Sequence, residues 1–220
     1  MAESRTYDLT GFDTVVVSMG IRTIVTTGQA HSVRVEARDA ATLDRLDVSV
    51  VGGRLKIGFG HFLDLIFNGG LFDLFRSDWD VTAYVSLPTL NGTEVSAGSR
   101  LEASNVKSDR FHGEASSGAQ LTLLGVTGGD FRLAASSGAQ VEIAGNAAEL
   151  DASASSGGRV RADRLSVERG RLEASSGGAI ETTVTTRVRA NASSGGHIEV
   201  AGNPTERDVN SSSGGNVSLR

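Results

Sequence analysis

The chain has 220 residues, which is long enough to bury a core without disulfide bonds. It contains no cysteine, so disulfides, thiolate metal sites and a cysteine nucleophile are excluded. Its 26 acidic residues outnumber its 21 basic ones, and the net charge of -5 provides no basic footprint for nucleic acid or an anionic membrane surface. Twenty-eight glycines beside two prolines indicate many tight corners between short strands.

The opening segment MAESRTYDLT contains no basic stretch followed by an apolar one, so we expect no signal peptide in the chain as given. No apolar run reaches the roughly 18 residues that a membrane-spanning helix needs. From residue 12 to 95, short runs of β-branched residues alternate with turn residues, and Gly52-Gly53 is typical of a β-hairpin. The predicted strands span residues 14–18, 21–26, 31–37, 46–51, 54–59 and 81–88.

From residue 95 onward the sequence repeats a Ser-Gly corner. The separations between successive corners are 20, 20, 19, 20, 18 and 19 residues, a period typical of solenoids. We therefore predict an all-β fold, a right-handed parallel β-helix with about 18–20 residues per coil. The corner glycines are Gly98, Gly118, Gly138, Gly157, Gly177, Gly195 and Gly214.

Alternation of side chains along each strand predicts which residues face the core. Around the third corner, one parity holds Phe131, Leu133, Ala135, Ser137 and Ala139, all apolar except the small serine. We therefore expect the second serine of each corner to point inward and to form a ladder of stacked hydroxyls. The ladder would comprise Ser117, Ser137, Ser156, Ser176, Ser194 and Ser213.

Two regions follow from this pattern. Residues 1–95 form an N-terminal strand region, and residues 96–220 form the solenoid repeats; the two can also make one continuous domain. The N-terminal strands are predicted either as early coils or as a capping sheet, since exposed strand edges at the end of a solenoid need cover.

Residues 59–79 form a concentrated apolar arm around Asn68-Gly69-Gly70. One hypothesis is an exposed arm that contacts another protein, a membrane surface or a second copy of the chain. The alternative is an arm that folds back as a cap on the solenoid. The residues concerned are Phe62, Leu63, Leu65, Ile66, Phe67, Leu71, Phe72, Leu74, Phe75 and Trp79.

Two outward columns of the repeat form a polar face that could bind an extended glycan or divalent ions. The alternative is a solvated face of mixed charge that serves solubility. The first column is Glu102, Thr122, Glu142, Arg161, Glu181, Glu199 and Ser218; the second is Arg100, Gln120, Gln140, Arg159, Ala179, His197 and Asn216.

Motifs for catalysis, cofactors and metals are missing from the sequence. No Gly-x-Ser-x-Gly elbow surrounds any corner serine, and the four histidines lack the close spacing of a zinc site. The glycine-rich strings lead into strands instead of helices, which argues against phosphate or dinucleotide loops. We expect no catalytic, cofactor-binding or metal-binding residue.

Several segments resemble the putative autotransporter adhesin head GIN domain family of bacterial envelope proteins, over roughly residues 12–218. They are Phe12 with Val15 to Val17 and Gly20, then HSVRVEA, then Gly53 to Ile57, then VTAYVSLPTLNGTEVSAGS. The last is the most specific, because a strand ending in Leu-Pro, then Leu-x-Gly and a first Ser-Ala-Gly corner, is an unusual string. The resemblance implies a secreted or periplasmic β-helical protein, an adhesin with no established enzyme activity.

The leading functional hypothesis is a non-enzymatic envelope or surface protein, periplasmic or extracellular, that presents its repetitive face to a glycan or an envelope protein. One alternative is a polysaccharide lyase or hydrolase with Glu142, Arg161 and Glu181 on adjacent coils. The other is a structural protein that self-assembles through the arm or an uncapped end.

Overall fold

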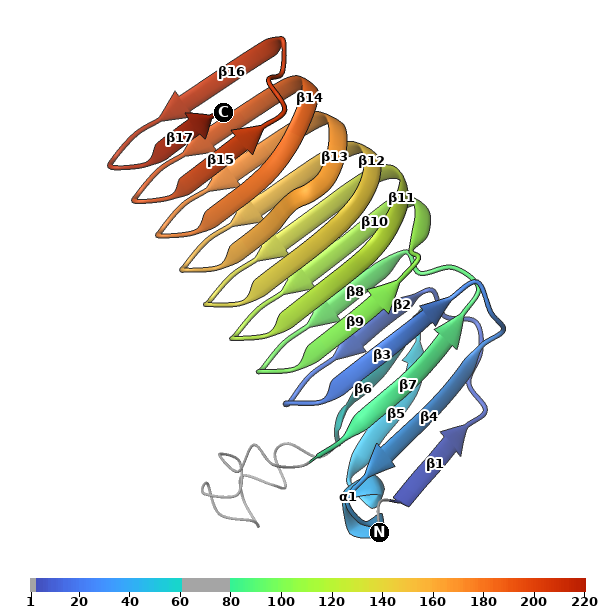
Figure 1. The fold of residues 1–220 in the computed structure, drawn as a ribbon. Coiled ribbons are helices and arrows are strands. Elements are labelled where there is room, and N and C mark those ends of the chain that lie inside the picture. Colours follow the sequence, from blue (N-terminus) through green and yellow to red (C-terminus); the bar gives the residue numbers. More distant parts are fainter. Residues whose placement is uncertain (1–2, 61–79) are drawn as a thin grey trace.

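The computed structural model describes residues 3–60 and 80–220 as an elongated stack of β-coils (Figure 1). The predicted all-β solenoid is confirmed. Each coil consists of two strands that face one another across the core, so the stack has two walls. Parallel pairing between successive coils extends each wall along the rod.

Wall 1 contains, from the N-terminal end, β5 (Leu46–Val51), β6 (Arg54–Phe59), β2 (Thr14–Val17), β8 (Gly92–Val95) and β10 (Lys107–Ala115). It continues through the second halves of the four long strands and ends at β16 (Glu206–Ser211). The long strands, which bend from one wall into the other, are β11 (Gln120–Ala135), β12 (Gln140–Ala154), β13 (Arg159–Ala174) and β14 (Ala179–Ala192).

Wall 2 contains β1 (Glu3–Tyr7), β4 (Ser32–Ala37), β7 (Thr82–Leu87), β3 (Arg22–Thr27) and β9 (Arg100–Ser104). It continues through the first halves of the long strands to β15 (His197–Ala201) and β17 (Asn216–Leu219). The short helix α1 (Ala40–Asp44) connects β4 in wall 2 to β5 in wall 1. Asp39 caps its N-terminus by accepting a hydrogen bond from the Thr42 amide at 2.8 Å.

The N-terminal region is partly solenoid and partly cap. Strands β2 and β3 form a complete coil that stacks on β8 and β9, and β6 and β7 pair with the outer edge of that coil. Beyond them the pairing becomes antiparallel, through β5 on wall 1 and through β4 and β1 on wall 2. The N-terminal strands therefore form both structures that the sequence allowed: coils of the solenoid next to the repeats, and a capping sheet at the outer end.

The corners are type I′ turns, in which both central residues have positive φ. At the corner of β10 and β11, Ser117 has φ 53° and Gly118 has φ 73°, and the Ala119 amide donates to the Ser116 carbonyl at 3.1 Å. The described residues contain eight such corners. The first, at residues 18–21, carries Met19 and Gly20 with φ 66° and 78° and lacks the Ser-Ser-Gly string.

The predicted inward serine ladder is wrong. Ser117 and its counterparts are exposed, because the two central residues of a type I′ turn project beyond the ends of the walls. The other residues of the predicted inward parity, among them Phe131, Ala135 and Ala139, are buried as expected. Alternation therefore holds in the strand segments next to each corner. It fails through the turn and also inside the long strands, where they bend from one wall into the other.

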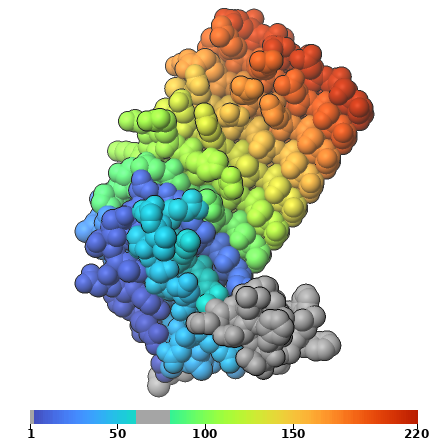
Figure 2. Space-filling model, turned by 180° about the vertical axis from the view of Figure 1, so that it is seen from behind, coloured from blue at the N-terminus to red at the C-terminus, as the bar shows by residue number. Residues whose placement is uncertain are grey.

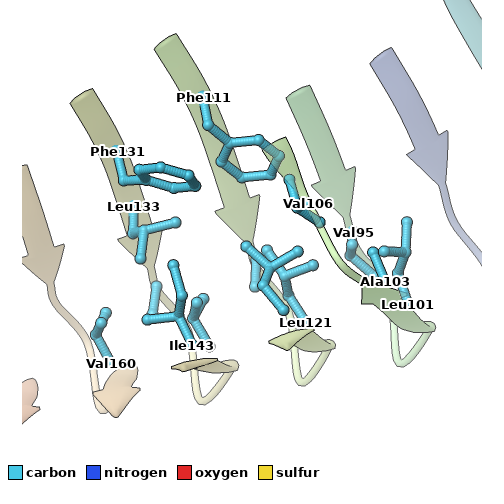
Figure 3. Close-up of a cluster of buried hydrophobic side chains, with 14 of the residues drawn as sticks. Val95, Leu101, Ala103, Val106, Phe111, Leu121, Phe131, Leu133, Ile143 and Val160 are labelled. Carbon is cyan, nitrogen blue, oxygen red and sulfur yellow. The ribbon is translucent and has the colours of Figure 1, made fainter. Parts of the chain in front are cut away.

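Aliphatic side chains from both walls fill the space between them, with two phenylalanines at the centre (Figure 3). The rings of Phe111 and Phe131 come from adjacent coils of wall 1 and stack with centroids 5.4 Å apart. Gly113 leaves room for this pair, since a Cβ there would lie 3.0 Å from the Phe111 ring and from Leu133. The core runs continuously from the cap to Ile198 and Val200 in the last coils.

Candidate functional site

The two polar columns expected from the sequence become two rows across wall 2. Pairing places Glu102 beside Thr122, Thr122 beside Glu142, and so on through Glu199 to Ser218. The same pairings align the second column from Arg100 to Asn216. Adjacent strands lie about 4.8 Å apart, so each row offers one side chain per coil at that spacing. We call these two rows the polar face.

Ion pairs on the polar face run between neighbouring coils. Glu142 pairs with Arg164, and Glu199 pairs with Arg220 at 2.7 Å. At the end of the second row, Asn216 Nδ2 lies 3.2 Å from His197 Nδ1. Glu142, Arg161 and Glu181 do lie in register on adjacent coils, but the ion pair that Glu142 forms is with Arg164 and not with Arg161.

The polar face is hollowed at its N-terminal end. A groove of about 190 Å³ lies there, lined by Arg22, Thr23, Arg100, Leu101, Glu102, Gln120 and Thr122. Arg22 pairs in register with Arg100, and Glu102 follows two residues later on the same face of β9. Arg22 was not among the predicted site residues, because its corner has Met19 in place of serine. The shared spacing of Gly20 and Gly98 from a following arginine was the available signal.

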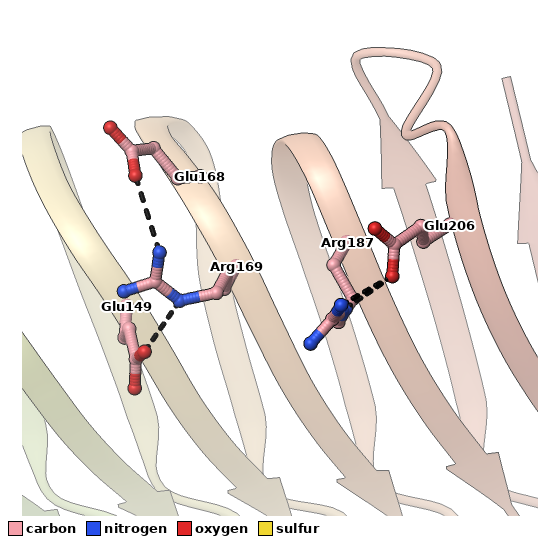
Figure 4. Close-up of polar contacts among 5 residues, drawn as sticks. All are labelled: Glu149, Glu168, Arg169, Arg187 and Glu206. Atoms are coloured by element: carbon pink, nitrogen blue, oxygen red, sulfur yellow. Dashed lines mark hydrogen bonds and ion pairs between the residues drawn. The ribbon is translucent and has the colours of Figure 1, made fainter.

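Wall 1 carries a second charged surface that the sequence analysis did not single out. A groove of about 300 Å³ is lined by five arginines and three carboxylates, although the chain as a whole is acidic. Figure 4 shows its central ion pairs, Arg169 with Glu149 and Glu168, and Arg187 with Glu206. The hydrogen bond from Arg169 Nε to Glu149 Oε1, 2.5 Å long, raises the pKa of Arg169 above its ordinary value.

The predicted arm lies outside the described residues, apart from Phe59 and Gly60. Strands β6 and β7, which flank it, belong to opposite walls. The ten predicted arm residues, Phe62, Leu63, Leu65, Ile66, Phe67, Leu71, Phe72, Leu74, Phe75 and Trp79, stay a prediction.

Each of the seven predicted corner glycines occupies the third position of a corner, with φ between 73° and 79°. Among residues 3–60 and 80–220, no three His, Asp or Glu side chains gather where they could hold a metal ion. In the same residues no helix has the length and apolar character of a membrane span.

The model of the family described as putative auto-transporter adhesin, head GIN domain, matches residues 11–204. The chain belongs to this family. The GIN domain described here is accordingly an adhesin-like surface protein. No curated protein sequence matches it.

Three crystal structures of distant sequence share the fold of this GIN domain. A "putative adhesin" from Bacteroides fragilis has a TM-score of 0.85 at 15% identity, covering 100% of this chain and 97% of that one. A "putative adhesin" from Parabacteroides distasonis has a TM-score of 0.68 at 16% identity, with coverage of 100% and 97%. A "putative lipid binding protein" from the same species has a TM-score of 0.65 at 17% identity, with coverage of 100% and 96%. At these identities the likeness concerns the fold.

In the space-filling view the coils appear as successive bands along the rod, from green to red (Figure 2). The side chains of each wall are thus held in rows by backbone pairing and not by loops. Such rows are preorganised for binding, because little conformational entropy is lost when a partner docks on them.

Proposed function

We propose that this GIN domain is a non-enzymatic binding head of the bacterial envelope or cell surface, whose polar face on wall 2 engages a glycan or an envelope protein. The observation that carries the proposal is the pair of registered polar rows, which end in the groove beside Arg22, Arg100 and Glu102. Arginine and carboxylate groups side by side can hydrogen-bond hydroxyl and carboxylate groups of a sugar chain.

Two further features support a binding role over catalysis. The polar face lies on coils of nearly uniform length, whereas an active site needs a cleft that excludes water. Glu142, one of the two acids in the trio named for a lyase or hydrolase, is paired with Arg164. A family of adhesin heads is also consistent with an envelope or surface location.

The test uses the full chain on glycan arrays and in pull-downs from envelope extracts, with a variant that combines Arg22→Glu and Arg100→Glu. We expect the parent protein to retain a glycan or an envelope protein, and the variant to lose it while its circular dichroism stays unchanged. A variant with Lys107→Gln and Arg110→Gln on wall 1 serves as the control and should bind like the parent. Empty arrays and empty pull-downs with the folded parent would overturn the proposal.

A further inference from the structure

Four arginines form a square on wall 1, the wall opposite the polar face. Pairing of β13 with β14 places Arg169 beside Arg187 and Arg171 beside Arg189. The square therefore measures about 4.8 Å between strands and about 7 Å along them. All four side chains are exposed at the rim of the 300 Å³ groove. We call these four residues the arginine square.

Like charges directly opposite one another on adjacent strands are unfavourable, so the arginine square needs compensation. The compensating acids lie outside it, on the coils to either side. Glu149 and Asp151 are in register on the preceding coil, and Glu206 and Asp208 on the following one. The charge sequence along both rows is thus acid, arginine, arginine, acid.

Acids on the outer coils contact three of the four arginines. Arg169 Nε donates to Glu149 Oε1 at 2.5 Å on one side, and Arg187 Nε donates to Glu206 Oε2 at 2.6 Å on the other (Figure 4). Arg189 Nε lies 3.3 Å from Asp208 Oδ2, also on the outer side. At both positions of the square, arginine on β13 stands opposite arginine on β14, so guanidinium groups border the space between the two coils, with Glu168 and Glu173 beside it on β13.

Donors remain available toward that space. A guanidinium carries five N–H groups, and the outer acids occupy only some of them. Arg171 is the least engaged: among the described residues its nearest acid is Glu173, with Nε and Oε1 3.8 Å apart, beyond hydrogen-bond length. The outer ion pairs are exposed to solvent, so they orient the arginines without fixing them strongly.

From this geometry we infer that the arginine square binds a single tetrahedral oxyanion, a phosphate or a sulfate group. Such a group presents several acceptor oxygens within the area of the square, and guanidinium forks bind it in bidentate fashion. The flanking acids also set the selectivity: a long polyanion crossing the coils would meet Glu149, Asp151, Glu206 and Asp208 on leaving the square. Compact anions are favoured over extended ones.

This inference does not depend on the function proposed for the polar face, which lies on the other wall. The oxyanion can be a free ion or an ester carried by a sugar, and both have the same chemistry at the square. The full chain is titrated with inorganic phosphate, inorganic sulfate, glucose 6-phosphate and glucose 6-sulfate, and binding is followed by calorimetry and by NMR of labelled arginine side chains. Heparin is the extended polyanion for comparison.

The variant Arg171→Gln with Arg189→Gln removes one arginine from each coil of the square, and Lys107→Gln with Arg110→Gln removes the same charge elsewhere on wall 1. We expect the first variant to weaken binding of the compact anions at least tenfold and the second to leave it unchanged. Tighter binding of the sugar esters than of the inorganic ions would identify a glycan-borne group, and equal binding would identify the free ion.

The inference is overturned if the parent binds none of the four compact anions, if both variants lose binding equally, or if heparin binds far more tightly than every compact anion. Arrays and pull-downs with the polar-face variants give a separate result, so failure at the arginine square and failure of the proposed function are told apart.

Discussion

The amide of Gly118 donates a hydrogen bond to the carbonyl of Ser137 in the next coil, at 3.1 Å. The same bond recurs from Gly20 to Ala97, from Gly98 to Ser117 and onward to Gly177 and Ser194. Hydrogen bonding between successive coils therefore continues through the corners, so the coils are joined at the turn as well as along the strands. Left-handed backbone at both central positions makes this possible.

We expect the two glycines of one corner to respond differently to alanine. Gly177 has φ 74° and open space around a Cβ, so Gly177→Ala should cost only the left-handed strain, about 1 kcal/mol. At Gly178 a Cβ would lie 2.2 Å from the Ala154 carbonyl oxygen, so Gly178→Ala should cost more, about 3 kcal/mol. Urea unfolding followed by circular dichroism measures both. Equal losses would mean that the corner relaxes freely.

The exposed serine of each corner is a site for stabilisation. Ser137 has φ 51°, which asparagine adopts at lower cost, so Ser137→Asn should raise the free energy of unfolding by roughly 0.5 kcal/mol. Ser136→Asn, one residue earlier and outside the left-handed region, is the matched control and should give no gain. A loss of stability in Ser137→Asn alone would support an inward role for the serine hydroxyl.

The stacked phenylalanines should dominate the stability of the central coils. Phe131 is completely buried, so Phe131→Ala should lower the free energy of unfolding by about 4 kcal/mol, and Phe131→Leu by about 1 kcal/mol. Thermal and urea unfolding check both values. If Phe131→Ala costs under about 1 kcal/mol, the coils collapse around the vacated space and the walls are less rigid than the pairing implies.

Stability should depend on the ionisation of Asp39. Hydrogen bonds from the Thr42 amide and hydroxyl, both 2.8 Å long, hold the pKa of this carboxyl below its ordinary value of 3.8. Because the folded-state pKa is the lower one, the stabilisation is complete above pH 3.8 and is lost as the pH falls through the folded-state value. The unfolding free energies of the parent and Asp39→Ala should differ at pH 7 and converge in acid. A pH-independent difference would assign the effect to packing.

A buried hydroxyl offers a gain in stability. Thr182 is 2% exposed, and its Oγ1 has no hydrogen-bond partner among the described residues. Valine has the same shape without the polar group, so Thr182→Val should raise the free energy of unfolding by about 1 kcal/mol. Thr185→Val is the control. The Thr185 hydroxyl donates to the Val167 carbonyl at 3.1 Å, so its removal should lower the free energy of unfolding. A loss of stability in Thr182→Val would indicate an ordered water at the hydroxyl.

Local features of the sequence predicted several elements closely. The hairpin at Gly52-Gly53 joins β5 and β6, with Val51 paired to Arg54. The spacing of the corners placed Glu102, Thr122 and Glu142 in one row, because a constant coil length puts equivalent residues in register. The strand β1 and the helix α1 were not predicted, since each is only five residues long and carries no repeat signal.

The repeat spacing does not explain the size of the residue at the end of each corner. That position changes from Ile21 through Ser99, Ala119 and Ala139 to Gly158 and then glycine in every later coil. A Cβ at Gly158 would lie 2.3 Å from the Ala135 carbonyl oxygen. The sequence shows this change from large to small, but only the packing of one coil against the next explains it.

The β-solenoid and its coil length could be predicted from the sequence, because a repeated turn with a fixed spacing allows few other folds. The family could be predicted from the segments around Phe12 and at VTAYVSLPTLNGTEVSAGS. Tertiary structure decided the rest: the direction of the corner serines, the mixed character of the N-terminal region and the gathering of Arg169, Arg171, Arg187 and Arg189. Those four arginines are as far as 20 residues apart in the chain and became neighbours only through the parallel pairing of β13 with β14. Which side chains meet across coils depends on register and on the turn, and neither is visible in a single strand.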